Sequence, residues 1–210
     1  MELSEQFNNI TKLYGSFSKN PGTFGYNFFN KQFKYQKINA IYIPFQINDI
    51  KKAIKSITEF NIQGVGISQP YKIESMQYID GIDSVAKEIG SINTILNNNS
   101  NLIGYNTDWL AIFDTIKDFN NQIYILGNGG YAKAAFYACK KLNKSYINIT
   151  RDNWYIPQDG LVVNCTPLII EKNNIINANV NTKSGKKLAF QQACYQYKIY
   201  IGNNPNVSIY

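Results

Sequence analysis

The chain has 210 residues, of which 44% are hydrophobic and 17% are charged, and its formal net charge is +7. This composition is typical of a folded globular protein and excludes a disordered one. The sequence has no histidine, and its three cysteines form no Cys-x-x-Cys pair. We therefore expect no metal site and no disulfide framework, and Ser-His-Asp and Cys-His catalysis are excluded. Any general acid or base is a lysine, carboxylate, tyrosine or cysteine.

The positive charge is spread along the chain rather than gathered in one run, and Arg151 is the only arginine. Arginine is the preferred residue for bidentate contacts with phosphates and bases, so nucleic-acid binding is the least favoured function. No apolar run reaches the roughly 18 residues of a membrane helix, and residues 1–5 lack the basic start of a signal peptide. We expect a cytoplasmic protein that does not bind membranes.

The first half of the chain alternates strand and helix patterns, which predicts a layered α/β unit. Apolar residues at helical spacing follow two candidate N-caps, Asn48 and Asp49. In chain order we expect a buried strand at 38–44 that Pro44 ends, a helix at 49–60, a strand at 62–68, helical pieces within 72–88, and strands at 91–97 and 101–105 joined by the turn 97–100.

The second half predicts a βαβ unit with a third strand, and we place the domain junction just before it. A helix begins near Asp108, with one face formed by Trp109, Ile112 and Ile116. After it we expect a strand at 122–126, a helix at 130–142, strands at 145–150 and 161–163, an irregular Asn-rich segment at 173–181, and a final helix at about 186–200.

A glycine-rich turn connects the strand at 122–126 to the helix at 130–142. Glycines at such a turn let the backbone approach a pyrophosphate closely, while the free amides and dipole of the helix start attract its charge. A turn of purely structural purpose is the alternative, but the flanking strand and helix favour a dinucleotide site. The candidate cofactor-binding residues of this turn are Gly127, Asn128, Gly129, Gly130, Tyr131 and Ala132.

The next predicted strand ends at Thr150 and Arg151, where a dinucleotide fold meets the adenosine ribose. A guanidinium at this position can bind a 2′-phosphate, whereas an acidic residue would repel that group and bind the free hydroxyl. Arg151 therefore favours NADP over NAD. An ordinary solvated surface charge is the alternative, and Asp152 directly after Arg151 complicates the assignment.

Four blocks together resemble the shikimate dehydrogenase family, in order and in spacing. One is the glycine turn, and the other three are Ser16-Phe17-Ser18, Gly66-Ile67-Ser68-Gln69-Pro70-Tyr71-Lys72, and Gly90-Ser91-Ile92-Asn93-Thr94 running on to Gly104-Tyr105-Asn106-Thr107-Asp108. The resemblance implies an α/β fold with an N-terminal substrate-binding domain at 1–107 and a shortened Rossmann-type NADP-binding domain at 108–185. A C-terminal helix at about 186–202 is expected to pack back on the substrate domain.

The resemblance also implies residue roles. Lys72 and Asp108 are expected to form the catalytic pair that handles the hydroxyl proton during hydride transfer. Ser16 and Ser18 are expected to hold a substrate carboxylate, and Ser68, Asn93 and Gln192 to bind ring hydroxyls. Asn164 and Thr166 match the segment near the nicotinamide end of the cofactor. Taken alone, Lys72 is also compatible with a surface lysine at a helix start, and Asp108 with a helix N-cap.

The sequence departs from the family at several points. Tyr26-Asn27 stands where a histidine-asparagine pair is usual, and Gly66 replaces a usual asparagine. Between Leu168 and Gly185 the chain lacks a stretch that carries a substrate-binding tyrosine in the family. This shortening predicts a smaller Rossmann sheet, a wetter nicotinamide side, and slower turnover or a different substrate.

Three functions remain open. The favoured one is an NADP-dependent dehydrogenase that interconverts 3-dehydroshikimate and shikimate, or a closely similar cyclic hydroxy acid. The second is a dehydrogenase for quinate or another polyol acid. The third is a module that binds a dinucleotide or carboxylate with little or no turnover. For the dehydrogenase functions the expected partner is a small carboxylate substrate, and the protein is expected to be a monomer or homodimer.

Overall fold

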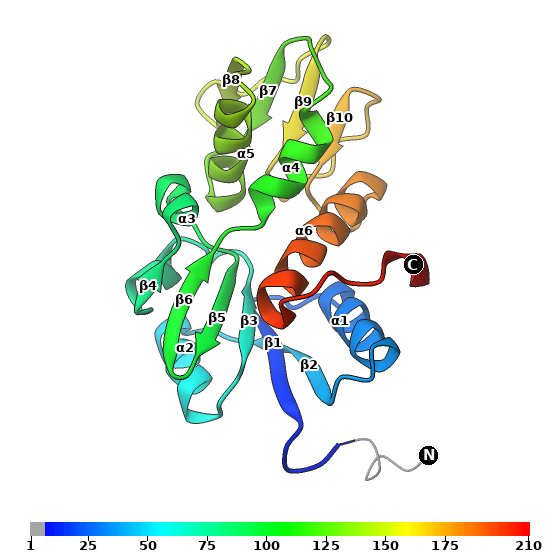
Figure 1. The fold of residues 1–210 in the computed structure, drawn as a ribbon. Coiled ribbons are helices and arrows are strands. Elements are labelled where there is room, and N and C mark those ends of the chain that lie inside the picture. Colours follow the sequence, from blue (N-terminus) through cyan, green and yellow to red (C-terminus); the bar gives the residue numbers. More distant parts are fainter. Residues whose placement is uncertain (1–6) are drawn as a thin grey trace.

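The computed structural model describes residues 7–210, which form two β-sheets with helices packed on them (Figure 1). Residues 1–5, considered above for a signal peptide, lie outside this range. The α/β fold class is confirmed. In chain order the elements are β1 (Lys12–Ser18), α1 (Phe24–Tyr35), β2 (Ala40–Gln46), α2 (Ile50–Glu59), β3 (Gly64–Ile67), a 3-10 turn (Glu74–Gln77), β4 (Gly81–Ile82), α3 (Ser84–Ile89), β5 (Thr94–Asn98), β6 (Asn101–Tyr105), α4 (Asp108–Ile116), β7 (Ile123–Leu126), α5 (Gly130–Lys141), β8 (Tyr146–Ile149), β9 (Leu161–Asn164), β10 (Ile175–Asn177), α6 (Lys183–Ile201) and a second 3-10 turn (Val207–Ile209).

The first sheet has six strands in the order β2-β1-β3-β5-β6-β4, and helices cover both of its faces. On one face α2 packs through Ile54 and Ile57 against Val65 and Ile95 of the sheet. The predicted cap of α2 is confirmed, because the Asp49 side chain accepts a hydrogen bond from the third backbone amide after it. The apolar stripe of this helix therefore places it on the sheet as its spacing predicts.

Helices α1 and α6 cover the opposite face of the first sheet with an aromatic cluster. Phe29 of α1 stacks on Tyr42 of β2 with the ring centroids 4.4 Å apart, and Tyr197 of α6 is fully buried among these rings. Close to the other end of α6, Leu188 belongs to the core around the second sheet. Helix α6 therefore packs against both halves of the molecule, as Figure 1 shows.

The second sheet is parallel throughout and has four strands in the order β10-β9-β7-β8. Helices α4 and α5 cover one face, and a small cluster around Ile149 and Val162 covers the other with loop residues such as Ile156 and Ile170. The chain goes from β7 through α5 to β8 on one side, and then returns to β9 on the other. In an open parallel sheet, ligands bind where the strand order reverses in this way, at the carboxyl ends of the strands.

Two predicted boundaries are wrong for physical reasons. Pro44 does not end its strand, because β2 continues to Gln46. Since β2 is an edge strand, the missing N–H of proline leaves no unpaired group inside the sheet. The segment 173–181 is not wholly irregular, because it contains β10, which extends the sheet beside β9. Elements β1 and α1 have no counterpart among the elements expected from the sequence.

The first turn of α6 packs closely on the preceding loop at Gly185. A Cβ at Gly185 would lie 1.9 Å from the backbone oxygen of Asn179, which itself accepts hydrogen bonds from the amide and hydroxyl of Thr182. We expect Gly185→Ala to lower the free energy of unfolding by about 1–3 kcal/mol, as overpacking does. Urea unfolding measures the loss, with Gly22→Ala as the control because a Cβ there meets nothing within 4 Å. Equal stability of the two variants would contradict this packing.

Candidate functional site

The two side chains predicted to act as a pair do lie together. The Nζ atom of Lys72 lies 2.5 Å from Oδ2 of Asp108, although 36 residues separate them in the chain. The side chains are only 11% and 3% exposed, respectively. A charge removed from water this far is tolerated only with a partner and hydrogen bonds, so each of the two groups stabilises the other. Lys72 is therefore not a solvated surface lysine.

Asp108 is free to pair with Lys72 because another residue caps its helix. The side-chain oxygen of Asn106 accepts hydrogen bonds from the amides of Asp108 and Trp109 at the start of α4. The alternative interpretation of Asp108 as the N-cap is therefore wrong, and both of its carboxylate oxygens point to other partners. Oδ2 contacts Lys72, and Oδ1 accepts a hydrogen bond of 2.9 Å from the side-chain amide of Asn93.

Asn93 links the pair to a second predicted residue, Gln192. Its side-chain Nδ2 lies within donor distance of Thr107 Oγ1 (2.8 Å), Asp108 Oδ1 (2.9 Å) and Gln192 Oε1 (3.0 Å). The Asn93 Oδ1 atom accepts a hydrogen bond from the backbone amide of Thr107. The segment directly before β5, the start of α4, and α6 thus meet at one polar cluster. Thr107 was not predicted, and its contacts depend on the folded geometry.

The glycine turn lies directly beside this cluster. The Ser91 hydroxyl donates to the backbone oxygen of Gly130 at 2.9 Å, and a Cβ at Gly130 would lie 3.0 Å from Cβ of Lys72. The Lys72 ammonium also lies 5.2 Å from the centroid of the Tyr131 ring, within cation–π range. The predicted catalytic residue Lys72 is therefore in contact with two residues predicted to bind cofactor, Gly130 and Tyr131.

Two other titratable groups near the pair stay neutral at physiological pH. Burial raises the pKa of Tyr131 well above its ordinary value, and the charge of Asp108 raises it further. Burial also raises the pKa of the Cys165 thiol, again with help from Asp108. Neither group can serve as a thiolate or phenolate base near pH 7, so the Lys72–Asp108 pair is the group suited to move a proton.

The backbone of the glycine turn leaves room for a ligand. Gly127 has φ = +105°, which side-chain-bearing residues rarely adopt, while a Cβ at Gly129 would meet nothing within 4 Å. Gly129 is the N-cap of α5 and provides no side-chain cap. Within residues 7–210, the amides of Gly130, Tyr131 and Ala132 have no hydrogen-bond acceptor. Open space and unsatisfied donors at one helix start suit an anionic group such as a pyrophosphate.

Neighbouring strands support the turn. The side-chain amide of Asn148 donates to the backbone oxygens of Ile125 and Gly127, and the backbone amide of Cys165 donates to the backbone oxygen of Leu126. Predicted residue Thr166 lies beside the turn, with Cγ2 3.4 Å from a Cβ built on Gly127.

Asn164, also predicted at this end, is completely buried. Its Nδ2 atom donates to Leu168 O and Asn177 Oδ1, and its Oδ1 atom accepts from the amide and hydroxyl of Thr166. Asn164 therefore shapes the loop that presents Thr166.

Arg151 lies one strand away, in the exposed turn after β8. Thr150 bonds to the side chain of Asn153 through both its amide and its hydroxyl, which fixes the backbone before Arg151. Among the ion pairs of the described residues, none involves Arg151. Its guanidinium is therefore available to an anion.

The three predicted serines lie at the carboxyl ends of β1 and β3. Ser16 pairs in register with Gly66, and the amide of Ser68 donates to the oxygen of Phe17. Ser18 is buried, and its hydroxyl oxygen accepts a hydrogen bond from the backbone amide of Asn20. Ser68 is exposed. The serines thus lie at or near the carboxyl ends of two adjacent strands, and Lys72 lies in the turn that follows β3.

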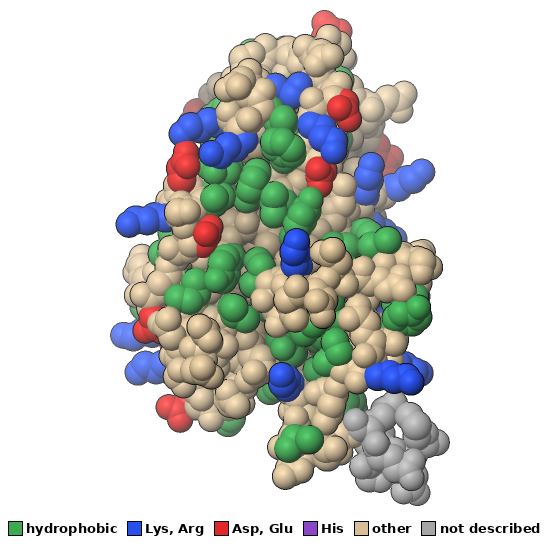
Figure 2. Space-filling view, viewed as in Figure 1, with side chains coloured by type: hydrophobic (Ala, Val, Ile, Leu, Met, Phe, Trp, Pro, Cys, Tyr) green, Lys and Arg blue, Asp and Glu red, His purple; other side chains and the backbone are tan. Residues whose placement is uncertain are grey.

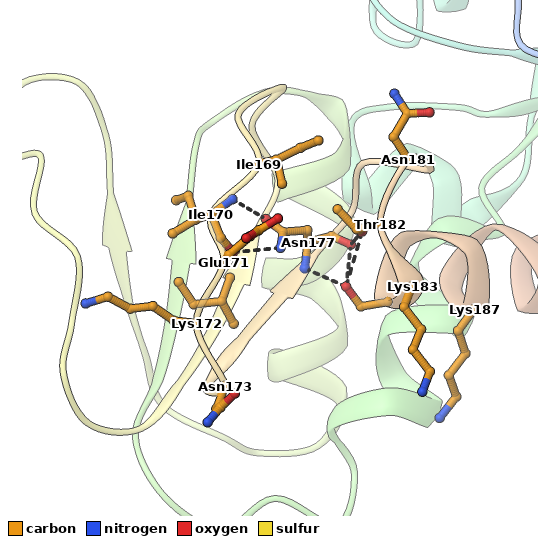
Figure 3. A pocket seen from close by; sticks show the side chains of 12 residues that line it. Ile169, Ile170, Glu171, Lys172, Asn173, Asn177, Asn181, Thr182, Lys183 and Lys187 are labelled. Atoms are coloured by element: carbon orange, nitrogen blue, oxygen red, sulfur yellow. Dashed lines mark hydrogen bonds between the residues drawn. The ribbon is translucent and has the colours of Figure 1, made fainter.

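Two surface recesses lie away from Lys72 and Asp108. One, of about 770 Å³, lies between the loop 169–173 and the start of α6 (Figure 3). Lys172 there extends away from Lys183 and Lys187, so its lysines do not converge on one point. The second, of about 530 Å³, lies beside the glycine turn and is lined by Glu88, Ile89, Asn128, Lys133, Phe136, Tyr137, Lys140 and Tyr146.

The molecular surface carries no dominant basic patch on the face drawn in Figure 2, where lysines are scattered between acidic and neutral side chains. Within residues 7–210, no helix is both long enough and apolar enough to cross a membrane. The same residues contain no cluster of three or more side chains that could hold a metal ion.

The arrangement defines an α/β protein in which a Rossmann-type sheet presents a glycine turn to a buried lysine–carboxylate pair. Residues 23–95 match the family model described as the shikimate dehydrogenase substrate binding domain. A shikimate dehydrogenase-like protein of Haemophilus influenzae is 38% identical over 137 residues, which cover 63% of this chain and 51% of that protein. A protein of Pyrococcus furiosus named shikimate dehydrogenase (NADP(+)) is 37% identical over 142 residues, 64% of this chain and 52% of that protein.

Solved structures show the same fold. The structure of shikimate dehydrogenase from Aquifex aeolicus aligns with a TM-score of 0.82 and 22% identity, and the alignment covers 97% of each chain. The chain is thus similar to the shikimate dehydrogenase family in sequence, with residues 23–95 matching its substrate-binding domain, and it has the fold of solved members over nearly its whole length. In sequence, the matched segment spans about half the length of the two curated relatives.

Proposed function

We propose that this protein is an NADP-dependent dehydrogenase that interconverts 3-dehydroshikimate and shikimate, or a closely similar cyclic hydroxy acid. One observation carries the proposal: the buried Lys72–Asp108 pair touches the start of the glycine turn, through Cβ of Lys72 beside Gly130 and its ammonium beside Tyr131. Proton-transfer groups and a dinucleotide-type turn thus meet at one place.

We assign a role to each half. Residues 1–107, with the helix at about 186–202, form the substrate-binding domain, and residues 108–185 form the NADP-binding domain. Ser16, Ser18, Ser68, Asn93 and Gln192 bind the substrate. The open space above Gly129 and the unpaired amides that follow fit the pyrophosphate of a dinucleotide.

The chemistry requires both halves. A bound nicotinamide supplies the acceptor for a hydride from the carbon that bears the reacting hydroxyl, and that carbon becomes a ketone. The hydroxyl proton must leave at the same time, and Lys72 receives it within hydrogen-bond reach as a neutral amine, after its ammonium has released a proton to solvent. Asp108 keeps the amine in place, and Asn93 fixes the carboxylate. In the reverse direction the Lys72 ammonium returns the proton to the ketone oxygen.

The proposed choice of NADP rests on Arg151 and on relatives that carry NADP(+) in their names. We expect Arg151→Ala to weaken NADP binding by about 1.5–3 kcal/mol, because a charge-assisted contact with the 2′-phosphate is lost. NAD lacks that phosphate, so its affinity should hardly change. Calorimetric titration of both cofactors measures the difference, and equal losses for NADP and NAD would refute the phosphate role.

The direct test of the function is an assay of NADP reduction over a substrate panel that includes shikimate and quinate. We expect absorbance from the reduced cofactor with shikimate. Reduction with quinate but not with shikimate would favour the polyol-acid dehydrogenase instead. Calorimetric binding of NADP without turnover of any panel member would favour the third function, a dinucleotide-binding module. The short segment between Leu168 and Gly185 is the feature of the sequence that supports this third function.

A further inference from the structure

Gln196 lies on the substrate side of the site, although no motif identified it. It follows Gln192 by one helical turn, so both side chains lie on the same face of α6. Gln196 is only 3% exposed, and its Nε2 atom donates to the backbone oxygen of Asn93 and to the hydroxyl of Thr94. Its carboxamide is thus fixed to Thr94, the first residue of β5, and to the predicted substrate residue Asn93 directly before it.

The carboxamide of Gln196 also occupies the place above a missing side chain. A Cβ at Gly66 would lie 3.2 Å from Nε2 of Gln196, 3.1 Å from the hydroxyl of Tyr42 and 3.5 Å from Cβ of Ser16. Gly66 pairs in register with Ser16 on one side and with Thr94 on the other. Gln196 therefore reaches from α6 over the sheet to the position that a side chain at residue 66 would fill.

The other end of this carboxamide is unused. Both hydrogen atoms of Nε2 have acceptors, which fixes the orientation of the amide, because an oxygen could not donate to the carbonyl of Asn93. Oε1 accepts no hydrogen bond from residues 7–210. It is also not one of the fully buried atoms without a partner, which in these residues are Ser75 Oγ, Tyr197 OH and Tyr200 OH. Gln196 Oε1 is thus a fixed acceptor that keeps a small opening to solvent.

We propose that Gln196 is a specificity-determining residue whose Oε1 atom accepts a hydrogen bond from one ring hydroxyl of the bound cyclic hydroxy acid. This inference rests on the proposed function. A carbonyl acceptor favours a hydroxyl donor at this position and disfavours a ketone, a carboxylate or a missing group. Because the amide is held by Asn93 and Thr94, it discriminates without first having to become ordered.

The test compares Gln196→Met with a matched control on the same helix, Gln191→Met, whose side chain contacts Thr115 instead. Initial rates are measured with NADP and shikimate, quinate and analogues that each lack one ring hydroxyl. We expect Gln196→Met to lower kcat/KM by about 10- to 100-fold for acids that carry the recognised hydroxyl, mainly through KM. For the analogue that lacks this hydroxyl the loss should be close to absent. Gln191→Met should keep the wild-type pattern.

Other outcomes overturn the proposal in distinguishable ways. An equal loss for every acid would show a merely structural role for Gln196, and no loss would show that its oxygen touches no substrate. A wild-type protein that turns over none of the acids would remove the proposed function itself, and this inference with it.

A reciprocal exchange provides a second test, which also serves if Gln196→Met does not fold. A side chain at residue 66 collides with Gln196, so Gly66→Asn alone should lower activity. Gln196→Ala makes room for a side chain at residue 66. The double variant Gly66→Asn/Gln196→Ala should regain part of the discrimination lost in Gln196→Ala, because the new asparagine amide would lie close to the position of the Gln196 amide. A double variant no more selective than Gln196→Ala alone would overturn the proposal.

Discussion

Lys72→Met is expected to lower kcat by about 10²–10⁴-fold, the usual contribution of a positioned proton-transfer group. Methionine keeps Cβ and an unbranched side chain one atom shorter than that of lysine, so the contact of residue 72 with Gly130 is preserved. NADP affinity should therefore stay unchanged while turnover is lost. Steady-state rates together with calorimetric binding of NADP separate the two effects.

The control for this variant is Lys55→Met, which removes an exposed lysine of α2. It should match the wild type in both measurements. A Lys72→Met enzyme that retains wild-type kcat would show that the ammonium takes no part in the reaction, however close it lies to Asp108.

The second large effect concerns stability. Removing either member of a buried pair leaves an uncompensated charge, which typically costs about 3–5 kcal/mol. Lys72→Met leaves the carboxylate of Asp108, and Asp108→Asn leaves the ammonium of Lys72 beside the Tyr131 ring. Each single variant should therefore unfold at lower urea concentration than the wild type.

The double variant Lys72→Met/Asp108→Asn should be more stable than either single variant, because no buried charge remains. A double-mutant cycle of unfolding free energies at neutral pH measures the coupling energy between the two side chains. If the two single losses simply add in the double variant, the side chains do not form a coupled pair in solution. The same cycle measured on kcat should show that the second substitution adds little, since we propose that both residues serve one proton transfer.

Local patterns predict the elements whose apolar spacing is regular. The helix behind Asp49 and the βαβ unit after residue 122 both follow from periodicity and from a cap or a glycine turn. Helix α1 could have been found in the same way, because Phe24, Phe28 and Phe29 already recur at helical spacing. Pro44 misled the assignment of β2, since only the sheet order reveals an edge strand.

The candidate site was less accessible to sequence reasoning. The sequence predicts Lys72 and Asp108 as a pair only through the combination of the four family-like blocks, because neither residue alone indicates a catalytic role. That Asn106 caps α4, and thereby frees Asp108, depends on side-chain geometry that no spacing rule fixes. Gln196 meets Asn93 across 103 positions of the chain, so its role follows only from the folded structure.

Transfer of a labelled hydrogen is the direct test of the proposed hydride transfer with Lys72 as proton acceptor. Shikimate carrying deuterium on the carbon of the reacting hydroxyl is incubated with the protein and NADP, and the reduced cofactor is analysed by mass spectrometry. We predict that the cofactor gains one deuterium with the wild type and almost none with Lys72→Met over the same time. Binding of both compounds by the wild type without any deuterium in the cofactor would contradict it.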